Sequence, residues 1–66
     1  MTVNEEETLY ALMGFIIVPV ETVYGLKFNV RNFTEEENGK VWTMHYLFSC
    51  KETALEYIRE KTEIYP

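Results

Sequence analysis

The chain has 66 residues, a mass of 7.9 kDa and a formal net charge of −5, and its eleven acidic residues are all glutamates. This length holds one small domain, 1–66, because domains usually have about 100–150 residues. The hydrophobic share of 47 % is typical of a folded chain rather than a disordered one. The six basic residues form no cluster, so we expect neither direct nucleic-acid binding nor a role at a membrane surface.

The chain has few means of crosslinking itself. One cysteine, Cys50, and one histidine, His45, allow neither an internal disulfide nor a His/Cys metal cage, and we expect no cofactor or metal. Ten aromatic residues (one Trp, five Tyr and four Phe) exceed what one small sheet with two helices can bury. We therefore expect a surface that binds a protein partner or forms a homodimer. The nearly uncharged run 8–20 is too short to cross a bilayer, which favours a cytoplasmic protein.

The N-terminus is predicted to form a short helix. Thr2 and Asn4 are both suitable N-cap residues, and the glutamates that follow complement the dipole of the first turn. Gly14 is a natural residue for ending this helix. Its apolar stripe is expected to consist of Leu9, Leu12 and Met13.

Three strands are predicted to follow. The β-branched run 15–18 indicates a strand, which Pro19 either ends or confines to a sheet edge. A weakly marked turn is expected at 20–22. Apolar and polar residues then alternate over 23–33, as in a half-buried strand, and the third strand is predicted over 40–48.

The hairpin between the last two strands contains an Asn-Gly dipeptide, a strong turn signal. The apolar residues of both strands share one face only if the loop has an odd number of residues, which favours a three-residue loop over 37–39. This register places Phe28 beside Phe48 and Val30 beside Tyr46.

The third strand is predicted to have two different faces. One is expected to be core and carries Trp42, Met44, Tyr46 and Phe48. The opposite face is expected either to be covered by the N-terminal helix or to be exposed as an interface. The candidate interface residues on that face and in the acidic turn are Arg31, Phe33, Glu35, Glu36, Glu37, Thr43, His45 and Leu47.

The C-terminal segment is predicted to be helical. Ser49 followed by Glu52 has the spacing of a capping box, and apolar residues then recur at helical intervals. Arg59 is expected to pair with Glu56 and Glu63 on the surface. The predicted fold is therefore α+β with the order α-β-β-β-α, in which a three-stranded antiparallel meander packs against a C-terminal helix and a short N-terminal helix.

Two features have a possible chemical role. Cys50 would occupy the first position of the C-terminal helix, where a thiol pKa is lowered, but His45 is the sole candidate base and no residue is placed to orient it. We expect an inert cysteine packed under the helix, and no enzyme. The glutamate triplets 5–7 and 35–37 form either an acidic docking surface for a basic protein or, separately, a helix-dipole partner and a soluble hairpin tip.

The run from Gly39-Lys40-Val41-Trp42 through Phe48-Ser49-Cys50 to Tyr57-Ile58 resembles a pattern common among small prokaryotic and phage accessory proteins. In these proteins a strand ending in Phe-Ser precedes a helix that opens with Lys-Glu and Ala-Leu. The resemblance implies a short, acidic, non-enzymatic protein, in some cases an inhibitor of a host defence enzyme. The expected function is stoichiometric binding to a protein partner. The alternative is a nucleotide or metabolite site between two subunits.

Overall fold

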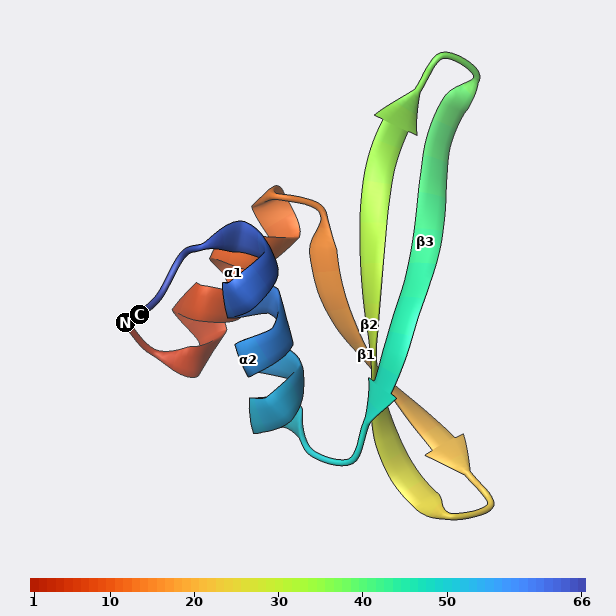
Figure 1. Cartoon of the computed structure of the whole chain (residues 1–66), viewed down its shortest axis with the longest axis vertical. Helices are drawn as coiled ribbons and strands as arrows, with labels where there is room; N and C mark the ends of the chain where they lie inside the picture. Colours follow the sequence, from red (N-terminus) through yellow and green to blue (C-terminus); the bar gives the residue numbers. More distant parts are fainter.

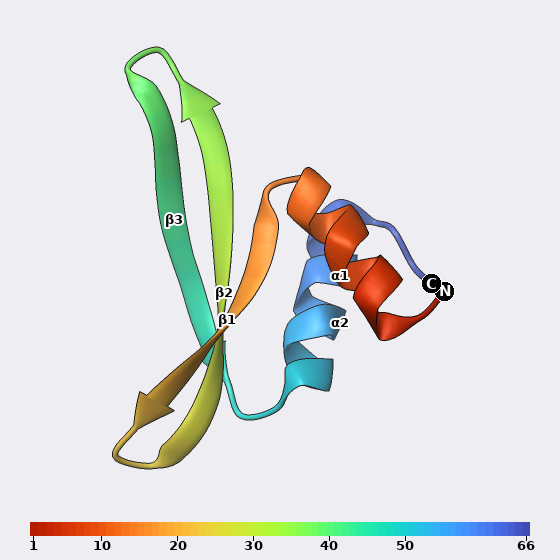
Figure 2. The ribbon, with the colours of Figure 1, turned by 180° about the vertical axis from the view of Figure 1, so that it is seen from behind.

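The computed structural model describes the backbone of residues 1–66 and all side chains except those of Trp42, Met44 and His45. The elements are α1 (Val3–Leu12), β1 (Phe15–Thr22), β2 (Gly25–Glu36), β3 (Gly39–Phe48) and α2 (Lys51–Thr62). The strands form one antiparallel sheet in the order β1-β2-β3, and both helices pack on the same face of it (Figures 1 and 2). The predicted α+β fold and element order are confirmed.

The edge strand β1 is longer than predicted. It continues through Pro19 to Thr22, so the turn expected at 20–22 is wrong and the chain reverses at 23–24 instead. Proline is tolerated because β1 is paired on one side only. The hydroxyl of Thr22 closes the reversal by donating to the carbonyl of Gly25 at 2.7 Å.

The β2–β3 hairpin has a different register from the predicted one. Glu36 pairs with Gly39, so the loop has two residues rather than three. A register shift follows between Asn29 and Arg31, where β3 contains one residue more than β2. Because of this bulge, Phe28 pairs with Phe48, as predicted. Val30 and Tyr46, which were also expected to pair, both lie within the bulge.

The bulge also changes which residues share a face. Beyond it, Phe33 is in register with Trp42 and Asn32 with Thr43, so the alternation predicted for the whole of 40–48 does not continue across it. The predicted burial of the Trp42 side chain falls outside the described side chains. The prediction that residues 42, 44, 46 and 48 share one face of the third strand is therefore wrong, because the backbone register shifts between Met44 and Leu47.

The core lies between the helices and one face of the sheet. Its buried apolar residues are Tyr10, Val30, Ala54, Leu55 and Ile58, with Phe15, Ile17, Phe28, Phe48, Tyr57 and Ile64 packed around them. The apolar stripe predicted for α1 is wrong for two of its three members, because Leu12 is 82 % exposed and Met13 is also exposed, whereas Leu9 is half-buried. Instead α1 directs Tyr10 and the charged Glu6 inward.

The backbone of Gly14, just after α1, lies in direct contact with the backbone of β2. Its φ is 94°, and a Cβ atom there would lie 2.4 Å from the carbonyl oxygen of Phe33. The amide of Phe33 donates to the carbonyl of Gly14 at 2.6 Å. Only glycine allows this backbone approach, which sets the position of α1 against β2.

The helix α2 begins one residue later than predicted. Its N-cap is Cys50 rather than Ser49, and the cysteine side chain makes no capping hydrogen bond to the backbone. Its C-cap, Glu63, adopts the left-handed conformation with φ 59°. The helix therefore depends on burial of its apolar face more than on the capping box expected from the sequence.

Candidate functional site

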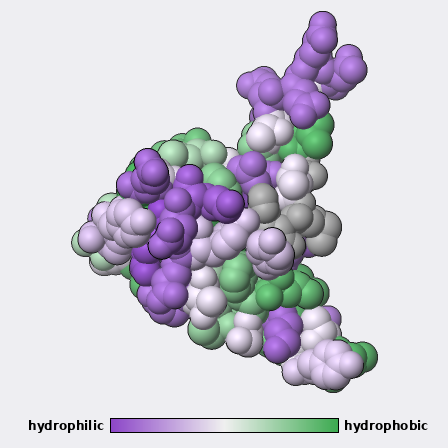
Figure 3. Space-filling view, in the orientation of Figure 1, coloured by the Kyte–Doolittle hydropathy of each residue, from purple (hydrophilic) through white to green (hydrophobic). Residues whose placement is uncertain are grey.

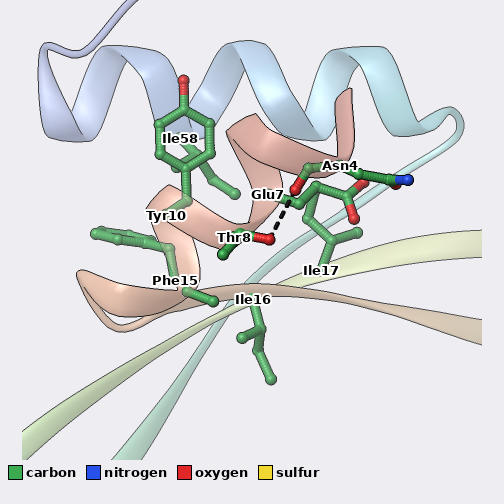
Figure 4. A pocket seen from close by; sticks show the side chains of 9 residues that line it. Asn4, Glu7, Thr8, Tyr10, Phe15, Ile16, Ile17 and Ile58 are labelled. Carbon is green, nitrogen blue, oxygen red and sulfur yellow. Dashed lines mark hydrogen bonds between the residues drawn. The ribbon is translucent and has the colours of Figure 1, made fainter. Parts of the chain in front are cut away.

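One face of the sheet carries no helix. Val30 and Ile17 point into the core, so their neighbours along each strand point the other way. Figure 4 shows this alternation, with Ile17 directed toward α1 and Ile16 directed away from it. We call this helix-free surface the open face; by register its described side chains include Ile16, Val18, Val20, Lys27, Asn29, Arg31, Phe33, Glu35, Lys40 and Leu47.

A buried asparagine organises the middle of the open face. Asn29 is 1 % exposed, and its amide nitrogen donates to the Tyr46 carbonyl in the bulge at 3.3 Å. The Nε of Arg31 donates in turn to Oδ1 of Asn29 at 2.8 Å. The Tyr46 carbonyl thus has a hydrogen-bond donor. The guanidinium of the half-buried Arg31 is held along the sheet instead of extending into solvent.

The apolar part of the open face comes mainly from β1. Ile16, Val18 and Val20 are half-buried on it, and Leu47 of β3 is 54 % exposed. Both faces of β1 are therefore apolar, although only one of them meets the helices. An unbroken apolar run such as 15–18 is typical of a strand that is covered on both faces, so this run could have predicted that β1 has an apolar side chain on each face.

The charge of the open face is opposite to that of the chain. By register it carries three of the six basic residues, Lys27, Arg31 and Lys40, and one of the eleven glutamates, Glu35. The Nζ of Lys40 lies 4.9 Å from the centroid of the Phe33 ring, which anchors it on this face. Hydrophilic residues otherwise gather over the helices and at the tip of the β2–β3 hairpin (Figure 3).

The predicted interface residues divide between two surfaces. Arg31, Phe33, Glu35 and Leu47 share the open face. Thr43 is exposed but pairs with Asn32, so the bulge places it on the other side of the sheet, and its predicted position with Leu47 is wrong. The exposed Glu36 and Glu37 lie at the hairpin tip, and the His45 side chain is outside the described residues. The residues that sequence reasoning left out of the candidate interface are Ile16, Val18, Val20, Lys27, Asn29 and Lys40.

A groove lies between α1 and the start of β1. It has a volume of about 360 Å³ and is bordered by Tyr10, Phe15, Ile17 and Ile58, with polar groups at its rim (Figure 4). The Thr8 hydroxyl donates to the Asn4 carbonyl at 2.8 Å. At the same rim, Oε1 of Glu7 lies 2.5 Å from Nζ of Lys51. These rim groups are thus held by the protein's own atoms.

The ionisable groups that the core encloses form one network between the helices. Glu6 is 2 % exposed, and Arg59 donates to both of its oxygens, from Nε at 2.6 Å and from a terminal nitrogen at 2.9 Å. The Tyr10 hydroxyl lies 2.6 Å from the same carboxylate and 2.9 Å from the Ile64 carbonyl. The predicted pairs of Arg59 with Glu56 and Glu63 are wrong, because its second partner is Glu52 at 2.9 Å.

The pKa values of the network follow its geometry. The hydrogen bond from Arg59, supported by that from Tyr10, lowers the pKa of Glu6 although burial opposes it. Burial, the hydrogen bond to Glu6 and its negative charge raise the pKa of Tyr10 to about 12. The carboxylate is therefore ionised and neutralised by a fixed cation at neutral pH, which suits a clamp between α1 and α2 rather than a proton-transfer site.

Cys50 is exposed at the start of α2, so the expectation that it packs under the helix is wrong. Its Sγ lies 2.9 Å from Oγ1 of Thr53, and this side-chain hydrogen bond is the main cause that lowers the thiol pKa. Any contact with the His45 imidazole lies outside the described side chains. Among the described residues, no group of three or more His, Cys or Glu side chains is placed to hold a metal ion.

Comparisons with protein-family models, curated proteins and solved structures find no match for this chain. No helix in the described part of the chain is long and apolar enough to cross a membrane.

Proposed function

We propose that this is a non-enzymatic binding protein that acts stoichiometrically on a protein partner, and that the open face is its contact surface. The observation that carries the proposal is that both helices pack on one side of the sheet, while the other side presents apolar side chains to solvent. Leu47 is 54 % exposed on this side, and Val18 is half-buried there with no helix over it. Patches of this kind on small soluble domains are typical of interaction sites.

The dimensions of the chain support an interface of ordinary size. Its accessible surface is 4759 Å², compared with about 4,400 Å² expected for a compact monomer of this mass. The chain has extents of 37 × 30 × 17 Å, and in the view down the shortest axis the helices lie beside the sheet (Figure 1). A typical stable interface buries about 800 Å² per partner, roughly a sixth of this accessible surface.

Two finer parts of the proposal rest on other grounds. A host defence enzyme as the target is implied by the resemblance of residues 39–58 to phage and prokaryotic accessory proteins. Homodimerisation follows from the small core of a 66-residue chain and stays a prediction. Sedimentation over a wide concentration range tests it, since a single species of 7.9 kDa at every concentration would contradict a dimer.

A pair of matched substitutions tests the contact surface. Val18→Glu places a charge on the open face, and Leu12→Glu makes the same kind of change on the exposed side of α1. Each tagged variant is used to recover a stoichiometric partner from extracts of the source cells, after circular dichroism has verified folding. We expect Val18→Glu to abolish recovery, because the new charge would lose its hydration in the contact. Equal recovery by both variants, or none by the wild type, would refute the proposal.

A further inference from the structure

We infer that the partner presents an acidic protein segment to the open face, with carboxylates next to apolar side chains. This inference rests on the proposed function and adds the chemistry of the partner. The reason is the uneven distribution of charge. The chain has a net charge of −5, yet three of its six basic residues lie on the open face. The remaining glutamates lie on or beside the helices, at the hairpin tip or on the opposite face.

The spacing of the open-face cations along β2 defines the spacing of the carboxylates that they could bind. Lys27 and Arg31 are four residues apart on β2, which separates them by about 13 Å along the strand. Lys40 lies farther along the same face, in register with Glu35, and is therefore partly neutralised. The strongest positive potential is expected at Lys27 and Arg31. An extended segment with carboxylates four residues apart matches this spacing.

The apolar flank agrees with such a segment. Val18 and Val20 of β1 are in register with Asn29 and Lys27, so the cations lie beside a β-branched surface. Arg31 is already held by Asn29 and loses little conformational freedom when it meets a carboxylate. A segment that alternates acidic and apolar residues would satisfy both parts of the face together.

Two other occupants fit the charges less well. A nucleic acid carries a phosphate at every nucleotide, and a strand lying along β2 would meet Glu35 and the neighbouring Glu36 and Glu37 at the hairpin tip. A second copy of the chain packed face to face would bring the three cations and one glutamate of each copy into one interface, and an excess of like charge there is unfavourable.

Synthetic eight-residue peptides test the inference directly. The probe is acetyl-Glu-Thr-Val-Thr-Glu-Thr-Val-Thr-amide, whose glutamates are four residues apart on one side when extended. Controls are the same peptide with lysine in place of glutamate, and a ten-nucleotide oligothymidylate. Each is titrated into the intact labelled protein, and binding is located from amide chemical shifts.

We expect the glutamate peptide to bind, with shifts concentrated on β1 and β2 at the open face. Lys27→Gln should weaken binding about two- to fivefold, whereas Lys61→Gln, which removes the same charge from α2, should leave it unchanged. Binding should also weaken with increasing salt. Tighter binding of the lysine peptide or the oligothymidylate, or no binding by any probe, would overturn the inference.

The proposed function can survive a failure of this inference. If Val18→Glu abolishes recovery of the cellular partner but Lys27→Gln leaves it unchanged, the open face binds a partner that is not recognised by charge, and only the inference falls. If sedimentation shows a dimer that Val18→Glu dissolves, a second copy occupies the face, which also overturns the inference. Loss of recovery with Val18→Glu, reduced recovery with Lys27→Gln and normal recovery with Lys61→Gln support the proposed function and the inference together.

Discussion

Replacement of Arg59 by alanine is expected to destabilise the protein severely. The guanidinium makes two hydrogen bonds to Glu6, whose carboxylate is 2 % exposed, and its removal leaves that charge with the Tyr10 hydroxyl alone. Breaking a buried ion pair from one side costs about 3–5 kcal/mol. A chain of 66 residues has a total stability of about 3–10 kcal/mol at the usual value per residue, so the loss is a large part of it.

The control is Glu52→Ala, which removes the other ionic partner of Arg59. The Glu52 side chain is 61 % exposed, so its loss should cost about 1 kcal/mol or less. Unfolding by urea, followed by circular dichroism at pH 7, compares the two variants with the wild type. Equal and small losses for Arg59→Ala and Glu52→Ala would refute the assignment of the buried pair as the clamp between the helices.

The same pair predicts a pH dependence. Arg59 lowers the pKa of Glu6 in the folded state, so the stabilisation is present above the unfolded pKa and is lost as pH falls through the lower folded value. In Arg59→Ala this cause is absent, and the buried carboxyl can be protonated at little cost in acid. The stability difference between wild type and variant should therefore shrink between pH 7 and pH 3. An unchanged difference at both pH values would contradict the linkage.

Three further outcomes are expected. Gly14→Ala should destabilise by about 2 kcal/mol or more, seen as a lower melting temperature, because its Cβ would meet the Phe33 carbonyl at 2.4 Å and its φ is 94°. In a spectrophotometric titration Tyr10 should ionise near pH 12; its contribution to stability is complete below the unfolded pKa of about 10 and is lost as pH rises through 12, whereas Tyr10→Phe should lack this late step. The thiol of Cys50 should react with iodoacetamide at pH 7 faster in the wild type than in Thr53→Val, which removes the side-chain hydrogen bond that lowers its pKa, and Cys50→Ser should leave partner binding unchanged.

Local patterns determined the element types and their order. Helix caps, β-branched runs and alternation act over about four residues, so the sequence alone predicted two helices and three strands. For Pro19 it left two alternatives, the end of the first strand or an edge position, and the structure shows the edge position. The same local reasoning was wrong about α1, because Leu12 follows helical spacing without being buried. Which face of a short helix is buried depends on what packs against it.

Long-range pairing decided the rest. The clamp joins Glu6 to Arg59 across 53 positions, and no local pattern marks such a pair. A bulge near Tyr46 exchanges the faces of β3, which separates Thr43 from Leu47. The cations on the open face, Lys27 among them, look scattered in the sequence because residues two apart on a strand, or on neighbouring strands, become neighbours only when the sheet forms. Tertiary structure therefore determined the sign of charge that this acidic chain presents on its uncovered face.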